Sequence, residues 1–179
     1  MLRKLFYAIA FVLFLAACKT SQKNQVSLSN INPYQYSGSK KIIAENGAVV
    51  SAHPLASKVG VEILKQGGNA VDAAIATQLT LAVVYPNAGN IGGGGFFVAR
   101  LGNGETVAID YREMAPAKAH RDMYIDADGK ARTDKSQLGH LSSGVPGTVA
   151  GLFESHKYGK LPFAKLIEPA IELAENGFC

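Results

Sequence analysis

The sequence predicts an α+β fold in which helices are layered on an antiparallel sheet. Apolar residues recur at helical spacing after residue 54, and the same spacing returns after residue 146. Between these regions an Asn-Gly turn separates two apolar runs, which is a strong signal for a β-hairpin. The expected order is therefore strand, two helices, hairpin, loop and helices, and such a mixed order favours helices packed on one antiparallel sheet.

Length and composition are those of one globular domain. The chain has 179 residues, of which 47% are hydrophobic and 18% are charged. Its net charge of +4 includes Arg3 and Lys4, which lie in a predicted leader. Because Lys and Arg are not gathered in runs interleaved with aromatic residues, the sequence does not predict nucleic-acid binding.

Residues 1–17 are predicted to form a lipoprotein signal peptide. Arg3 and Lys4 precede thirteen apolar residues, fewer than the roughly 20 that a membrane span requires. The following "LAAC" resembles the lipobox of bacterial lipoproteins, which implies acylation of Cys18 and an exported protein anchored to a membrane. Lys19 favours the outer membrane of the cell envelope. The alternative is an ordinary secreted protein that is cleaved near residue 17.

Residues 18–40 are rich in Ser, Asn, Gln and Lys, so we expect a flexible tether, with the folded domain covering residues 41–179. A short buried strand is predicted at residues 48–52. Pro54 then suits the first turn of a helix, which the pair Gly67-Gly68 ends.

The second helix is predicted at residues 70–84, with Asn69 as its N-cap and Asp72 near the positive end of its dipole. It is apolar almost all round and should therefore be buried. Strands follow at residues 96–101 and 106–110, then a polar loop with a turn at residues 126–129.

Helical spacing returns at Val149, Leu152, Phe153 and His156, where we expect a core-facing stripe. The last helical segment is expected at residues 162–176, with a kink or a new start at Pro169.

The four glycines Gly92–Gly95 have three possible explanations. A nucleotide-binding loop is disfavoured, since a strand rather than a helix follows the glycines. The run can instead be a strand entry that passes close to another backbone, where a side chain would clash. It can also shape one wall of a substrate cleft.

Arg112 is the candidate binding residue, because it lies just past a strand and its planar guanidinium can hold a carboxylate with two hydrogen bonds. Glu113 can brace that guanidinium or contact a substrate amine. An exposed Arg-Glu ion pair is the simpler alternative. His140, Ser142 and Ser143 are better explained as loop caps than as a catalytic set, and no nucleophile, metal site or cofactor is predicted in this chain.

Several segments resemble the large-subunit N-terminal region of γ-glutamyltranspeptidases, also called glutathione hydrolases. They are "GGNAVDAA", "NAGNIGGGGFFV", "DYREMAPAKAHRDMY" and "SSGVPGTVAGL". The resemblance implies part of the four-layer αββα sandwich of N-terminal nucleophile hydrolases. It also implies that Arg112 grips the α-carboxylate of a glutamyl group and, less firmly, that Glu113 lies near the site.

The resemblance further implies a precursor that cleaves itself into two subunits. The threonine at the start of the small subunit would attack the γ-glutamyl amide of glutathione or a related compound, and water or an amino-acid or peptide acceptor would resolve the acyl-enzyme. This threonine is not in the present sequence, so we expect a truncated, inactive portion of the enzyme. The alternatives are a glutaryl or cephalosporin acylase of the same architecture, or an inactive membrane-tethered binding lipoprotein.

Overall fold

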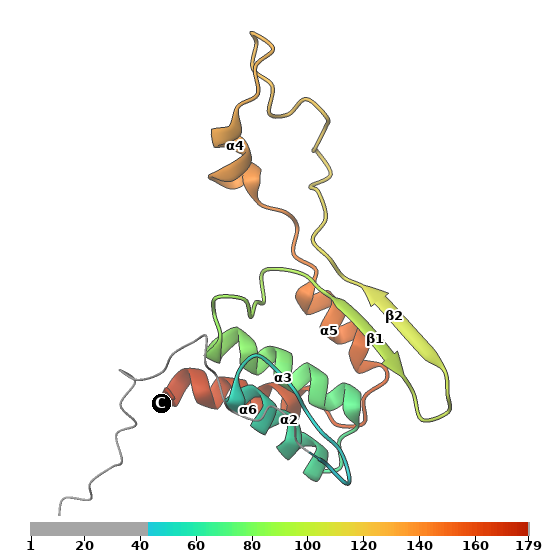
Figure 1. Cartoon of the computed structure of the whole chain (residues 1–179). Helices are drawn as coiled ribbons and strands as arrows, with labels where there is room; N and C mark the ends of the chain where they lie inside the picture. The colour runs from blue at the N-terminus through green and yellow to red at the C-terminus, as the bar shows by residue number, and fades with distance from the viewer. Residues whose placement is uncertain (1–42, 179) are drawn as a thin grey trace, which may run out of the picture. The chain divides into compact units, whose positions relative to one another are not determined.

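A computed structural model describes residues 43–178 of the chain, and those from Ala44 onward form one compact unit (Figure 1). The predicted signal peptide, Cys18 and the predicted tether at residues 18–40 lie outside the described residues. None of the helices in the described part is both long and apolar enough to cross a bilayer.

Helix α2, Pro54–Lys65, begins with proline at its first position and ends as predicted at the two glycines. Gly67 has φ +92°, a left-handed conformation that glycine adopts without strain. The Gly68 amide donates to the carbonyl of Ile63 and the Gly67 amide to that of Leu64, which is the hydrogen-bond pattern of a Schellman cap.

Helix α3, Ala70–Val84, is the centre of the helical layer and packs against α2, α6 and α5. Its predicted cap is confirmed: the Asn69 side chain accepts from the Asp72 amide, while the Asp72 carboxylate accepts from the Asn69 amide. The predicted burial is also confirmed, because nine of its fifteen residues are buried. The core of buried apolar side chains is built around it, from Ile63, Val71, Ala73, Ile75, Ala76, Leu79, Leu152, Leu166 and Ala170.

Strands β1, Phe96–Arg100, and β2, Thr106–Asp110, form the predicted antiparallel hairpin. The turn between them places Gly104 at φ +87°. The register pairs Phe97 with Ile109 and Ala99 with Val107 on the face that is turned towards the helices. The opposite face, which carries Phe96 and Val98, is exposed.

Residues 115–144 leave the hairpin as an excursion that runs away from the helices and returns (Figure 1). Its base is closed by Met114 and Val145, whose backbones exchange two hydrogen bonds of 3.1 and 2.8 Å. The predicted turn is present, with Gly129 at φ +75°. The short helix α4, Thr133–Gln137, was not predicted, and no residue of the excursion is buried.

Helix α5, Thr148–His156, exists as predicted, and the predicted core stripe is partly right, because Leu152 lies in the core and His156 is partly buried. The other two residues of the stripe are not in the core. Val149 and Phe153 are 46% and 54% exposed. The buried residues are Thr148, Gly151, Leu152 and Ser155. This face is buried because the chain that follows β2 lies directly against the helix, where only small side chains fit.

Helix α6, Phe163–Asn176, contains Pro169 and continues through it, so of the two alternatives the new start is excluded. One further expectation needs correction. Residues 48–52 are not a strand. Within the described residues no strand lies beside them, and Val49 instead packs against the helical core, close to Gly60 of α2.

The α+β prediction is confirmed by a layer of helices and an antiparallel pair of strands. The described residues contain one helical layer and one two-stranded sheet, which is a part of the four-layer sandwich that the resemblance implies.

Candidate functional site

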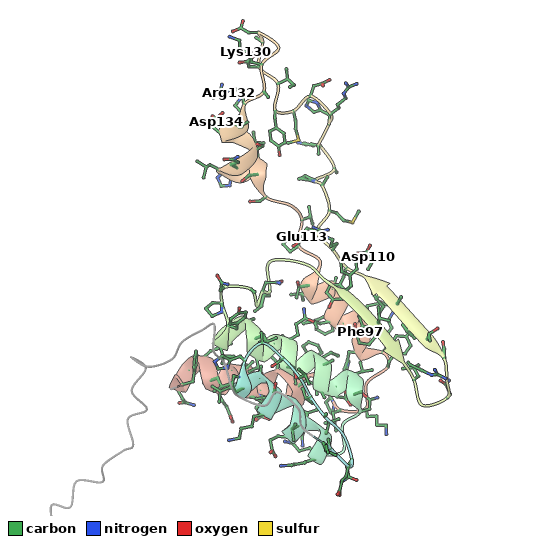
Figure 2. All side chains as sticks on the ribbon, in the orientation of Figure 1. Phe97, Asp110, Glu113, Lys130, Arg132 and Asp134 are labelled. Carbon is green, nitrogen blue, oxygen red and sulfur yellow. The ribbon has the colours of Figure 1, made fainter. Side chains whose placement is uncertain are left out.

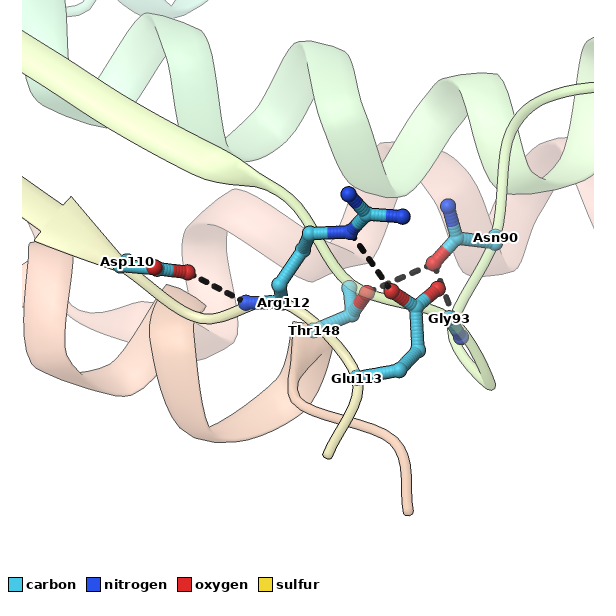
Figure 3. Close-up of polar contacts among 6 residues, drawn as sticks. All are labelled: Asn90, Gly93, Asp110, Arg112, Glu113 and Thr148. Atoms are coloured by element: carbon cyan, nitrogen blue, oxygen red, sulfur yellow. Dashed lines mark hydrogen bonds and ion pairs between the residues drawn. The ribbon is translucent and has the colours of Figure 1, made fainter. Parts of the chain in front are cut away.

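Arg112 lies two residues past the end of β2, on a backbone that is fixed on both sides. Its amide donates to the Asp110 carboxylate at 3.0 Å, an Asx-type bond that turns the chain away from the strand (Figure 3). Before it, the Tyr111 amide donates to the Gly95 carbonyl at 3.1 Å, and after it Met114 pairs with Val145. The strand is therefore followed by a short segment, residues 111–114, that is held by backbone hydrogen bonds at both ends and is called the arm below.

The side chain of Arg112 is 69% exposed, and its guanidinium lies near the carboxylate of Glu113. The Arg112 Nε and Glu113 Oε2 atoms are 3.7 Å apart, which is an ion pair but exceeds hydrogen-bond distance. Figure 3 shows both side chains turned towards the loop that carries Asn90 and Gly93. An exposed ion pair is one of the alternatives that the sequence leaves open for these two residues, and at this distance Glu113 does not occupy the guanidinium with two hydrogen bonds.

The glycine run lies against the backbone of this arm. A Cβ at Gly94 would approach the Cα of Arg112 to 2.8 Å and the amide nitrogen of Glu113 to 2.7 Å. A Cβ at Gly95 would come within 2.8 Å of the Tyr111 ring. The close backbone approach predicted for these glycines is therefore present, and it holds the residues on either side of Arg112.

Asn90 fastens the glycine loop to the start of α5. Its side-chain oxygen accepts from the Gly93 amide at 3.0 Å and from the Thr148 hydroxyl at 2.6 Å (Figure 3). The Gly93 carbonyl accepts from the amides of Gly147 and Thr148 at 2.8 and 3.0 Å. The first amides of α5 are thus bonded to the loop, so the loop, the arm and the helix form one unit.

A shallow open depression of about 380 Å³ lies between the arm and α5. Arg112 lines it, together with Asp110, Met114 and Glu154. The glycines in its lining are Gly147 and Gly151, whereas the run Gly92–Gly95 lies outside it. The lining of the depression therefore includes one arginine and two acidic residues beside several apolar residues.

The other polar residues that the sequence analysis considered lie away from Arg112. His140 and Ser142 form a single turn in the excursion, where the Ser142 hydroxyl donates to the Gly139 carbonyl, as a loop cap does. Within residues 43–178, no three His, Cys, Asp or Glu side chains lie close enough to hold a metal ion.

The strongest charge pair of the excursion lies at its far end. The Arg132 guanidinium makes two hydrogen bonds with the Asp134 carboxylate, and this contact lowers the pKa of Asp134 below its usual range. Figure 2 shows both residues well away from Glu113 and Asp110, so this pair does not contribute to the arm.

The sequence analysis missed the residues that support Arg112, namely Tyr111, Asn90, Thr148, Gly147 and Gly151. A signal for some of them was present. Gly147 and Gly151 are four residues apart, so they share one face of a helix start, and that face admits a close neighbour. The segment that packs against this glycine face is determined by tertiary packing, so the spacing of the glycines does not predict it.

The profile of one protein family, Gamma-glutamyltranspeptidase, matches residues 56–179. The glutathione hydrolase proenzyme of Escherichia coli K12 is 55% identical over 136 residues, which cover 75% of this chain and 23% of that protein.

Solved structures of similar proteins point to the same family. The γ-glutamyltranspeptidase of Helicobacter pylori superposes with a TM-score of 0.73 at 52% identity, covering 77% of this chain and 40% of that one. A cephalosporin acylase from Bacillus halodurans gives a TM-score of 0.57 at 29% identity, covering 78% of this chain and 27% of that one. The chain spans about a quarter of the length of the curated relatives it matches. The profile match over most of the described residues, together with these likenesses, shows that the chain belongs to the γ-glutamyltranspeptidase family.

Proposed function

We propose that this chain supplies the carboxylate-binding arm of an enzyme that cleaves the γ-glutamyl amide of glutathione and related γ-glutamyl compounds. The observation that carries the proposal is the placement of Arg112. Its guanidinium is exposed at the end of a strand, on a backbone held by the glycine loop and by the Met114–Val145 bridge. An exposed arginine on a fixed backbone is suited to bind a carboxylate ligand without first having to order the chain.

In this proposal the Arg112 guanidinium donates two hydrogen bonds to the α-carboxylate of the glutamyl group. The two groups match in planarity and spacing, so the contact fixes the direction of the substrate as well as its charge. The Glu113 carboxylate lies beside the guanidinium and is placed either to hold it in that direction or to attract the substrate amine.

The chemical step belongs to residues outside this sequence. The family resemblance implies that a threonine at the start of a small subunit, cut from the same precursor, attacks the γ-amide and forms an acyl-enzyme. Water would release glutamate, whereas an amino acid or peptide acceptor would take up the γ-glutamyl group. The role of Arg112 in both outcomes is to hold the glutamyl group in place.

We further propose that the protein is exported and lipid-anchored. The support is in the sequence: the apolar run in residues 1–17, the "LAAC" motif that ends at Cys18, and the polar tether at residues 18–40. Two or more acyl chains would anchor the protein stably, since each buried CH₂ contributes about 0.8 kcal/mol. Mass spectrometry of the mature N-terminus should find an acylated Cys18, and an unmodified cysteine there would exclude the anchor.

An acylase that acts on glutaryl or cephalosporin side chains is the second candidate, because a cephalosporin acylase shares this fold at 29% identity. The identity of 52% to a γ-glutamyltranspeptidase favours the first proposal. A comparison of glutathione with a glutaryl amide as substrates separates them, because both present a carboxylate to Arg112 but only glutathione carries the α-amino group that a γ-glutamyl site would bind.

The proposal is tested by Arg112→Ala in the enzyme expressed from its complete gene. Loss of a charge-assisted contact typically costs about 1.5–3 kcal/mol, so kcat/KM for a γ-glutamyl anilide should fall by about ten- to hundredfold. The matched control is Arg121→Ala, which removes an even more exposed arginine that also pairs with the carboxylate next to it in sequence. Unchanged kcat/KM in Arg112→Ala, or an equal loss in Arg121→Ala, would contradict the assignment.

A further inference from the structure

We propose that Tyr111 is a positioning residue for γ-glutamyl binding, which acts by fixing the arm that carries Arg112. This inference rests on the proposed function of Arg112 and adds a second residue to it. It is carried by three contacts of Tyr111, with α5, with the glycine run and with α3.

The ring of Tyr111 lies in a slot between two glycines. Gly151 is buried in the middle of α5, and a Cβ built there would overlap the ring at Cγ. On the other side of the slot, a Cβ at Gly95 would come within 2.8 Å of the ring carbon Cε2 and 3.1 Å of the hydroxyl oxygen. A ring confined by backbone on two sides has little room to change its rotamer.

The hydroxyl of Tyr111 joins the arm to the central helix. It donates to the side-chain oxygen of Gln78 on α3 at 3.1 Å, and the Phe96 carbonyl lies 3.5 Å from it. Gln78 is partly buried and lies on α3, the helix that has the most buried residues in the described structure. The residue that follows β2 is therefore bonded to the helix around which the core is built.

The backbone of Tyr111 transmits this anchoring to Arg112. The Tyr111 amide and carbonyl pair with Gly95, and a Cβ at Gly147 would overlap the Tyr111 carbonyl oxygen. Arg112 follows directly, with its Cα against Gly94. Because a binding group has to be held within about 0.5 Å of its productive position, a shift of Tyr111 would misplace the guanidinium without removing it.

The test uses Tyr111→Phe in the enzyme expressed from its complete gene, because this variant keeps the ring in its slot and removes only the hydroxyl. We expect KM for a γ-glutamyl anilide to rise about fivefold, the change that the loss of one hydrogen bond of about 1 kcal/mol produces, with kcat changed by less than about twofold. Gln78→Leu, which removes the other partner of the bond, should have the same effect, and the double variant should be no worse than either single one.

The control is Tyr124→Phe, which removes a hydroxyl that donates to the Leu141 carbonyl inside the excursion, and it should leave KM unchanged. A second readout separates positioning from general stability. In the Arg112→Ala background, Tyr111→Phe should have no further effect on KM. In the otherwise unchanged enzyme, Tyr111→Phe should also have no effect on KM for an analogue of the anilide that lacks the α-carboxylate.

An equal effect of Tyr111→Phe in the presence and absence of Arg112, an equal effect with the analogue, or no effect at all would overturn the role of Tyr111 while leaving that of Arg112 intact. If Arg112→Ala alone leaves kcat/KM unchanged, the proposed function itself fails, and the role of Tyr111 falls with it. The Arg112→Ala enzyme therefore tells the two failures apart.

Discussion

Asp72 is a buried carboxylate that joins the start of α3 to the loop between α5 and α6. Besides completing the cap of α3, its oxygens accept from the Lys160 amide at 3.0 Å and from the Leu161 amide at 3.3 Å. These amides belong to the loop between α5 and α6, almost 90 residues away in sequence. A buried carboxylate is tolerated here because several backbone amides surround it.

Asp72→Asn should loosen that loop. The asparagine side chain is of equal size, but its amide nitrogen cannot accept a hydrogen bond, so one or more buried amides lose a partner at a typical cost of about 1–3 kcal/mol. Hydrogen exchange measured by mass spectrometry should show faster exchange in peptides that contain Lys160 and Leu161. The matched control is Asp122→Asn, whose carboxylate is largely exposed. Unchanged protection at residues 160–161 would contradict this role.

Helix α5 is the element on which the candidate arm depends, because its glycine face receives Tyr111. Glycine inside a helix is normally less favourable than alanine by about 1 kcal/mol, so Gly151→Ala would stabilise an isolated helix. In the folded protein the added methyl group would overlap the Tyr111 ring. The glycine is therefore explained by tertiary packing and not by local conformation, since its φ is ordinary.

Gly151→Ala is accordingly expected to destabilise the protein, by about 1–3 kcal/mol, as overpacking of a core typically does. It should also raise KM for γ-glutamyl substrates, because Tyr111 has to move. Gly102→Ala in the hairpin turn is the control, since a Cβ there meets nothing within 4 Å. Thermal unfolding of both variants checks the prediction, and a midpoint for Gly151→Ala equal to or above that of the parent would contradict it.

Elements with local signals were predicted well. The proline at the start of α2, the Asn69–Asp72 capping box of α3 and the Asn-Gly turn of the hairpin are each determined by a few neighbouring residues. The position of Arg112 just past a strand was predicted for a similar reason, and its role in binding stays a prediction.

The elements that depend on distant partners were predicted poorly. Residues 48–52 have the composition of a strand but lie beside helices, where no strand is available in the described structure to pair with them. The stripe of α5 was assigned to Val149, Leu152, Phe153 and His156, and Leu152 is buried as predicted. Val149 and Phe153 are exposed instead, because Tyr111 packs against the small residue Gly151 of the adjoining face. Phe153 instead stacks on Phe163, with ring centroids 4.4 Å apart.

Across the whole described structure, the outer face of the hairpin is one of the apolar surfaces that the helices do not cover. Phe96 and Val98 are 63% and 81% exposed on it. The sandwich that the family resemblance implies would cover this face with a second sheet. Both long edges of the two-stranded sheet are also unpaired within the described residues.

The 179-residue chain expressed by itself is therefore expected to self-associate through the hairpin, as exposed apolar strands with unpaired edges do. Sedimentation velocity should show oligomers, and a Val98→Lys variant should reduce them by placing a charge on the exposed face. Lys130→Ala, at the tip of the excursion, is a control that should leave them unchanged. A monodisperse monomer of the parent chain would contradict the expectation.

The most direct test of the account is a crystal structure of the enzyme, expressed from its complete gene, with L-glutamate bound. The account predicts that both oxygens of the α-carboxylate lie about 2.7–2.9 Å from nitrogens of the Arg112 guanidinium, with Tyr111 still between Gly95 and Gly151. A bound glutamate whose α-carboxylate is held by other residues, with the Arg112 side chain directed into solvent, would contradict it.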